Sequence, residues 1–182
     1  TGDLTITGTT PATIAELKTI NAATNGNVVL NTATISATNV AAFTDTATNL
    51  AAAFDGITTS NSTLAISGTT PATIAELKTI NAATNSDVVL NPQTIATNYN
   101  DNAANLAAAF DDINTSTGDL TITGTDPVTV AQLITINAAT SGNVVLNAAT
   151  IADDQGDTAA NLAAAFDGSN TSTGEMEITG TT

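Results

Sequence analysis

The sequence predicts an α/β repeat solenoid, a fold in which short strands and helices alternate and successive strands extend one parallel sheet. A strand phrase and a helix phrase recur along the 182 residues at nearly constant spacing. A helix phrase separates each strand phrase from the next, as parallel strands require, because they are joined by long crossover connections. Apolar residues make up 42% of the chain but aromatic residues only 3%, which indicates thin layers of small side chains.

The repeat is clearest at residues 70–91, where a helix phrase precedes a short strand phrase. Nearly the same residues occur at 10–31, and a looser copy lies at 126–147. Each strand phrase ends in a glycine: Gly8, Gly68, Gly124 and Gly180. The interval between the first two glycines is longer than the two later intervals, which are equal. The first repeat holds four extra residues between positions 38 and 45, where we expect a surface loop or a helix extension.

Each long repeat divides into two halves with one strand and one helix each. A leucine recurs in every predicted helix at nearly even intervals, the first of which contains the insertion: Leu17, Leu50, Leu77, Leu106, Leu133 and Leu162. Apart from the insertion, one coil therefore has about 28 residues, a length typical of solenoid repeats. A coil of about 56 residues with two separate sheets is the alternative period. The Thr-x-x-Glu/Asn-Leu pattern that both halves share disfavours it.

The helix beginnings carry capping signals. Residues 13–16 and 129–132 match the capping box, in which a threonine hydroxyl and a Glu or Gln side chain satisfy free backbone amides reciprocally. Prolines stand just upstream, where a missing amide proton costs nothing: Pro11, Pro71 and Pro127. Apolar residues spaced three and four apart, such as Leu50, Ala53 and Phe54, then indicate one buried helical face.

The predicted strands are short and alternate in polarity, so the apolar side chains of each strand should face the helices. These apolar pairs are Leu4/Ile6, Val28/Leu30, Leu64/Ile66, Val88/Leu90, Leu120/Ile122, Val144/Leu146 and Met176/Ile178. This pattern predicts about seven strands and six helices. Right-handed crossovers and steady progression along the sheet place every helix on one face.

We expect one solenoid segment over residues 1–182. Its long repeats are 3–62, 63–118 and 119–174, followed by a partial repeat at 175–182. Solenoids normally end in polar caps, and neither end here departs from the repeat. The sequence therefore predicts an uncapped segment, either cut from a longer array or covered at its ends by neighbours.

Composition excludes several functions. Two Lys/Arg stand against 17 Asp/Glu, and the resulting charge of −15 repels nucleic acid and anionic lipid headgroups. The absence of Cys excludes disulfides and thiolate metal sites. No apolar run approaches the roughly 18 residues of a membrane span. No His is present, so a nucleophile activated by imidazole is excluded, and we predict that the chain is not an enzyme.

The sheet face opposite the helices is one candidate interaction surface, because a flat and partly apolar face can pack on another sheet, a fibre or a ligand. Its residues are Thr5, Thr7, Val29, Asn31, Val89, Asn91, Thr121, Thr123, Val145 and Asn147. A solvated Thr-rich face is the alternative. Regular threonines also suggest ice binding, which the intervening Val/Asn pairs disfavour. Because the asparagines recur at matched positions, a structural role in bonding neighbouring backbone is the simpler interpretation for them.

Carboxylates in the loops form a candidate calcium site, because calcium prefers oxygen ligands from loops. The candidates are Asp111, Asp112, Asp119, Asp167 and Glu175. No EF-hand loop or glycine-rich nonapeptide is present, so solvated turn residues are the alternative, and no other cofactor is predicted. Three Asn-x-Ser/Thr sequences, at 61–63, 114–116 and 170–172, fit glycan attachment.

The phrases at 129–142 and 157–166 resemble repeat arrays of large secreted or cell-surface bacterial proteins, including cyanobacterial ones. Such arrays often occur with calcium-binding haemolysin-like repeats. The resemblance covers almost the whole chain and implies an extracellular or cell-surface setting, in agreement with the acidic, Cys-free composition.

These observations predict a non-enzymatic structural segment of an extracellular bacterial surface protein: an adhesin stalk, a filament or a surface layer. The expected partner is the protein itself, through open solenoid ends or the exposed sheet face. The alternative is a binding module that uses the Thr/Val face or the acidic loops to hold calcium, glycan or ice.

Overall fold

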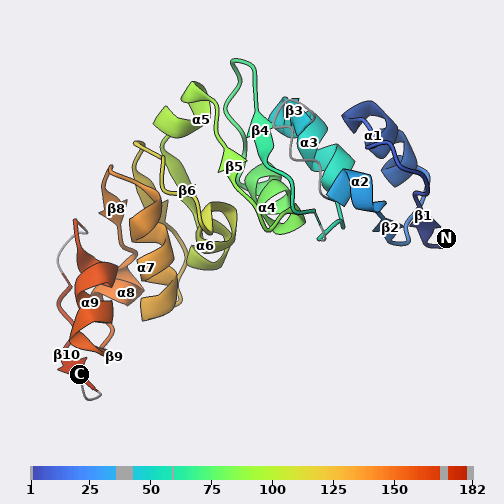
Figure 1. Ribbon diagram of the computed structural model, residues 1–182. Coiled ribbons are helices and arrows are strands. Elements are labelled where there is room, and N and C mark those ends of the chain that lie inside the picture. Colours follow the sequence, from blue (N-terminus) through green and yellow to red (C-terminus); the bar gives the residue numbers. More distant parts are fainter. Residues whose placement is uncertain (1, 36–42, 59, 169–171, 180–182) are drawn as a thin grey trace. The chain divides into compact units, whose positions relative to one another are not determined.

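The computed structural model describes residues 2–35, 43–58, 60–168 and 172–179 (Figure 1). Within these residues the fold is mixed α/β, with nine helices and ten short strands in small parallel sheets. The chain forms two compact units, Thr1–Thr94 and Ile95–Thr182. Most of the predicted insertion between positions 38 and 45 lies outside the described residues.

The first unit holds two parallel sheets, β1-β2 and β3-β4-β5, with β4 in the middle of the second. Its elements are β1 (Leu4–Thr5), α1 (Ile14–Ala22), β2 (Val28–Val29), α2 (Thr32–Ile35), β3 (Thr44–Asp45), α3 (Ala47–Phe54), β4 (Leu64–Ile66), α4 (Ile74–Ala83) and β5 (Val88–Val89). Helix α5 (Pro92–Ala96) follows and contains the division between the units.

The second unit repeats this plan, with the sheets β6-β7-β8 and β9-β10. Its elements are β6 (Tyr99–Asp101), α6 (Ala103–Phe110), β7 (Leu120–Ile122), α7 (Val130–Ala139), β8 (Val144–Val145), α8 (Ala148–Ala152), β9 (Gln155–Asp157), α9 (Ala159–Phe166) and β10 (Met176–Ile178).

The strands differ from the prediction in number and in grouping. The sequence predicts seven strands in one sheet, whereas the ten strands of the described residues form four sheets. The strands β3, β6 and β9 were not predicted, because their sequences have no alternating apolar pattern. At most one residue of each strand is buried. A short unpredicted helix, α2, α5 or α8, precedes each of these strands. At these helices one sheet ends and the next begins.

Three strand types therefore recur. Lead strands (β3, β6, β9) come directly before a second-half helix, middle strands (β1, β4, β7, β10) carry the Leu-x-Ile phrase or its Met-x-Ile variant, and trailing strands (β2, β5, β8) carry Val-Val. The complete order of lead, middle and trailing strand occurs twice, in β3-β4-β5 and in β6-β7-β8. The strand types thus recur with the period of the long repeat, whereas long capped helices occur twice in each long repeat.

The long helices start as predicted. Thr13, Thr73 and Thr129 each form a complete capping box with the Glu or Gln three residues later. The second-half helices begin at simpler caps, in which the side chain of residue 46, 102 or 158 accepts a hydrogen bond from the third amide of the helix. These caps hold each helix start at a defined residue, because they satisfy amides that have no partner inside the helix.

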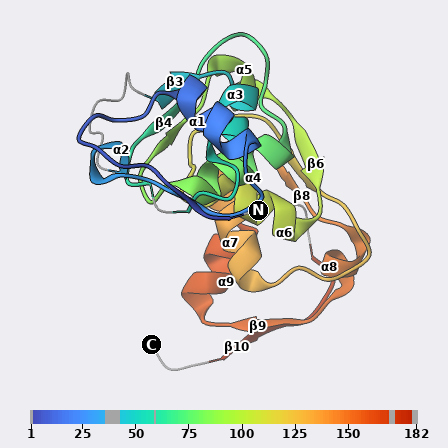
Figure 2. The same ribbon diagram turned by 90° about the vertical axis from the view of Figure 1, so that its right-hand side faces the viewer.

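Helix packing forms the core of each unit. In the first unit α3 packs against α1 and α4, and in the second α7 packs against α6 and α9 (Figure 2). The recurrent leucine of every long helix is buried, as predicted. Aromatic rings also meet edge to face, Phe43 on Phe54 at 5.4 Å and Tyr99 on Phe110 at 5.5 Å between ring centroids. The matched position in the last repeat is Gln155.

Three matched turns follow the second-half helices. Their central residues have left-handed backbones, with φ 71° at Gly56, 56° at Asp112 and 67° at Gly168. Side chains with a Cβ disfavour this region, whereas glycine adopts it freely. Asp112 therefore holds a conformation that glycine holds in the other two repeats.

We expect Asp112→Gly to raise the free energy of unfolding by about 0.5–1 kcal/mol, because relief of the left-handed conformation outweighs the added freedom of the unfolded chain. Asp111→Gly is the control, since Asp111 has φ −56° and gains no such relief. Urea unfolding measures both. Equal effects of the two substitutions would contradict the explanation.

Candidate functional site

The predicted exposed face is distributed over separate sheets. Val29, Val89 and Val145 are 47%, 46% and 38% exposed, and Thr5, Thr7 and Thr123 are exposed as well. Thr121 is half-buried beside Val145, its partner in the β7-β8 register. The accessible part of this face thus consists of one outward valine on each trailing strand and its neighbours on the middle strand.

The three asparagines of the predicted face are not exposed. Asn31, Asn91 and Asn147 are 8%, 3% and 8% exposed, so their assignment to that surface is wrong. Strand alternation ends one residue before them, because each lies immediately before a short helix and turns its amide inward. Their alternative role, bonding to neighbouring backbone, is confirmed.

These asparagines form what we call the Asn–Thr clasp, with the threonine three residues later. In the first unit, Nδ2 of Asn91 donates to the carbonyl oxygens of Gly68 at 3.1 Å and Thr70 at 3.0 Å. Its Oδ1 accepts from the amide of Thr94 at 2.9 Å. The fully buried hydroxyl oxygen of Thr94 in turn accepts from the amide of Ala72 at 2.9 Å. One side chain pair therefore ties the chain after β5 to the chain before α4.

The clasp has the same geometry in all three repeats. The asparagine amides donate to backbone carbonyls 21 and 23 residues upstream. The threonine hydroxyls accept from the residue after the upstream proline at 2.9 to 3.0 Å. Its members are the pairs Asn31/Thr34, Asn91/Thr94 and Asn147/Thr150. The Asn-x-x-Thr spacing was the available sequence signal, since it matches a helix cap.

A second asparagine set joins neighbouring helices. Nδ2 of Asn21 in α1 donates to the carbonyl oxygens of Ala52 at 3.2 Å and Asp55 at 2.9 Å, at the end of α3. Asn137 in α7 makes the corresponding bond to Ala164 in α9 at 2.8 Å. These amides satisfy carbonyls that a helix end leaves unpaired.

The structure does not bring the candidate calcium ligands together. Asp111 and Asp112 follow α6, Asp167 follows α9, and Asp119 binds the amide of Asn143 at 2.8 Å. The amide of Glu175 donates to another carboxylate, that of Asp154, at 2.8 Å. Within the ranges that the structure describes, no three acidic side chains are close enough to hold one metal ion. The calcium site stays a prediction from the sequence, and no contact among the described residues supports it.

Carboxylates elsewhere have helix-capping roles. The backbone amide and hydroxyl of Thr13 hold the pKa of Glu16 below its ordinary value of 4.5. Burial raises the pKa of Glu76, but hydrogen bonds from Thr48 and from the Thr73 amide and hydroxyl outweigh it and lower the value. Gln132 accepts the same two bonds in the third repeat without a charge. These pKa shifts therefore have a structural cause.

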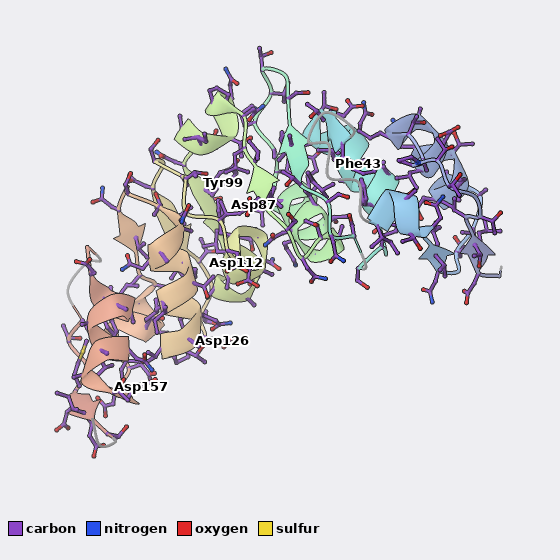
Figure 3. The ribbon with its side chains drawn as sticks, viewed as in Figure 1. Phe43, Asp87, Tyr99, Asp112, Asp126 and Asp157 are labelled. Carbon is purple, nitrogen blue, oxygen red and sulfur yellow. The ribbon has the colours of Figure 1, made fainter. Side chains whose placement is uncertain are left out.

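A hollow of about 420 Å³ lies between the start of α7 and β9. Its walls are Pro127–Ala131 together with Asp153 and Gln155–Asp157. The Asp153 carboxylate accepts from Nε2 of Gln155 at 2.7 Å, and that of Asp157 accepts from Nδ2 of Asn161 at 2.8 Å. Figure 3 shows Asp157 at the start of α9. Both carboxylates of the hollow are thus hydrogen-bonded within their own turns.

The predicted glycan sites differ in accessibility. Asn61 and Asn114 are exposed. The hydroxyl of Ser116, third in the 114–116 sequence, is buried and donates to the carbonyl oxygen of Ile95 at 3.3 Å. The third sequence, 170–172, begins outside the described residues. Glycan attachment stays a prediction.

No family model, curated protein or solved structure matches this chain. The resemblance to bacterial repeat arrays consequently remains a prediction from the phrases at 129–142 and 157–166. In the part of the chain that the structure describes, no helix combines the length and apolarity needed to cross a membrane.

Proposed function

We propose that the chain is a non-enzymatic structural segment of an extracellular bacterial surface protein, as an adhesin stalk, filament or surface layer. We further propose that its strand–helix coils form a repeat solenoid. The observation that supports both is the Asn–Thr clasp, which recurs in every long repeat and in which each threonine bonds to backbone 22 residues upstream. Recurring buried polar groups of this kind favour a scaffold over a reaction centre.

The distribution of polar groups supports the same proposal. Among the described residues, every buried side-chain nitrogen or oxygen has a hydrogen-bond partner. Active sites commonly hold groups whose pKa values are strongly shifted toward a reaction. The shifted carboxyls, Glu16 and Glu76, belong instead to capping boxes. The repeated residues are thus explained by folding and stacking.

The setting follows from composition and resemblance. A net charge of −15 without any Cys suits an extracellular protein that needs no disulfides, and the resembled arrays are secreted or on the cell surface. The binding alternative keeps its own support in the outward valines Val29, Val89 and Val145, which lie at matched positions.

Thermal melting with calcium chloride, magnesium chloride or EDTA tests the structural role. A ligand of the native state must raise the Tm, so a scaffold without a calcium site should melt at the same temperature in all three. A rise specific to calcium would favour the binding module. Small-angle X-ray scattering from the monomeric fraction tests the solenoid. A compact domain of this length should have a radius of gyration of about 16 Å, and we expect the radius of gyration of a solenoid to be larger.

A further inference from the structure

We propose that Lys18 and Asn49 become joined by a covalent amide crosslink, which the chain forms by itself with Asp45 as the proton-transfer group. The crosslink is a modification site between α1 and α3. It goes beyond the proposed structural role and does not depend on it. The inference is carried by the contacts of these three side chains, all of which lie in the first unit.

The three side chains form one connected hydrogen-bonded group. Nζ of Lys18 in α1 donates to Oδ1 of Asn49 in α3 at 2.5 Å. Nδ2 of Asn49 donates in turn to Oδ1 of Asp45 in β3 at 2.7 Å. All three residues are half-buried, where α1 packs against α3. An amine, a primary amide and a carboxylate thus meet in the order that amide transfer requires.

The lysine nitrogen is close to the carbon that it must attack. A C=O bond is about 1.2 Å long, so Nζ of Lys18 lies within about 3.7 Å of Cγ of Asn49. Reactive arrangements hold the two reacting atoms about 3–3.5 Å apart. Rotation about the last bonds of the lysine side chain covers this difference, so no movement of α1 relative to α3 is needed.

The reaction exchanges one amide for another. The neutral amine nitrogen of Lys18 forms a bond to Cγ of Asn49, and the bond between Cγ and Nδ2 breaks. The Asp45 carboxylate takes one proton from Nζ and gives it to Nδ2, which leaves as ammonia. Because lysine begins as an ammonium group, its other proton is also released and converts the ammonia to ammonium in solution. No oxidant or second reactant is consumed.

The basic residues of the chain are confined to this helix position. The sequence has two Lys/Arg residues, and both are the fifth residue of a first-half helix, Lys18 in α1 and Lys78 in α4. The chain has 17 acidic residues with which a lysine could pair, yet Lys18 bonds to a neutral amide. The placement therefore favours a role that depends on the amide.

The third repeat shows the same arrangement without a lysine. Ile134 stands at the lysine position of α7, and Nδ2 of Asn161 still donates to Oδ1 of Asp157 at 2.8 Å. The Asn–Asp pair thus forms at the start of a second-half helix whether or not a lysine is present. In the first repeat the lysine is added to a pair that is already positioned.

The crosslink would close a loop of the chain from residue 18 to residue 49. A covalent link of this kind stabilises a fold mainly because it restricts the unfolded chain, as disulfides do. The sequence contains no Cys, so disulfides cannot supply this restraint. We therefore expect the crosslinked chain to have a higher Tm than the same chain without the link.

Trypsin digestion of the denatured full chain tests the crosslink, because trypsin does not cleave after a lysine whose Nζ is acylated. Lys78→Arg is introduced first, so that Lys18 carries the remaining side-chain amine. We expect the intact mass to be lower than the sequence mass by one ammonia. We also expect trypsin to release fragment 1–78 whole, whereas a free Lys18 gives fragments 1–18 and 19–78.

Two further variants of this chain are the controls. Lys18→Arg keeps the positive charge but has no amine that can be deprotonated to attack an amide, so it should keep its full mass and be cleaved after residue 18. Its Tm should be lower than that of the linked chain. Asp45→Asn keeps an acceptor for Asn49 but removes the proton carrier, and a time course of intact mass should show crosslinking slowed by about 10²–10⁴-fold.

Three results would overturn the inference. Full mass together with cleavage after Lys18 would show that the contact stays a hydrogen bond. Loss of ammonia with normal cleavage after Lys18 would place the change elsewhere, as in a succinimide at Asn25–Gly26. Crosslinking of Asp45→Asn at an undiminished rate would remove the role of the carboxylate. None of these outcomes alters the calcium-independent melting expected of a scaffold, so the two proposals fail separately.

Discussion

Replacing Phe110 by alanine should lower the free energy of unfolding by about 3–5 kcal/mol, the usual loss when a fully buried aromatic side chain is removed. Phe110 is buried at the end of α6, where its ring meets Tyr99 at 5.5 Å and an interplanar angle of 64°. The substitution removes this contact and leaves a cavity between α6 and its sheet. Urea unfolding followed by circular dichroism measures the loss.

Phe166→Ala is the matched control, because Phe166 holds the same place in α9 but is half-buried, and the position that matches Tyr99 is Gln155 in this repeat. We expect its loss to be clearly smaller than that of Phe110→Ala. Equal losses would show that the ring pair in β6 and α6 contributes nothing beyond what any repeat provides.

Replacing Asn91 by alanine should cost about 1–3 kcal/mol, because one buried backbone amide loses its acceptor and two part-buried carbonyls lose their donor. The carbonyls of Gly68 and Thr70 lose their donor, and the amide of Thr94 loses its acceptor. Hydrogen exchange should show faster exchange at the Thr94 amide, which reports the broken cap directly.

Asn85→Ala is the control for the clasp. Asn85 is exposed, and its side chain donates to Oδ1 of Asn61 at 3.3 Å, also at the surface. We expect a change within about 0.5 kcal/mol, as for most surface substitutions. If Asn91→Ala were as mild as Asn85→Ala, the clasp would not be a stabilising feature of the repeat.

Local signals in the chain were sufficient to predict the six long helices, but not the short helices α2, α5 and α8. Thr13, Thr73 and Thr129 form the expected capping boxes, and the recurrent leucines are buried. Both features depend on residues three or four positions apart, which lie on one side of a helix wherever that helix is placed. The helix starts therefore needed no knowledge of the neighbouring coil.

The sheets were harder to predict. The strands β3, β6 and β9 have two or three residues each, and they exist because a middle strand lies beside them, not because of their own pattern. Asn31, Asn91 and Asn147 continue a strand in sequence but cap a helix in the structure, so alternation assigned them to the wrong face. Their glycine partners lie 23 residues upstream, beyond the reach of a local pattern.

The candidate carboxylates show the same division. Their clustering in sequence suggested a common site, yet Asp119 bonds to Asn143 and Asp112 occupies a left-handed turn position. Neighbours in a loop sequence point in different directions, because each turn residue follows its own backbone conformation. A shared ligand site requires convergence in space, which composition does not describe.

The sequence by itself determined the repeat, the helix starts, the buried leucines and the acidic, Cys-free chemistry, because these depend on composition and on short spacings. Only the tertiary structure decided how strands group into sheets and which polar side chains turn inward. Those outcomes depend on hydrogen bonds between segments far apart in the chain, such as Asn91 with Gly68 and Thr94 with Ala72. Such bonds form only once the coils lie beside one another.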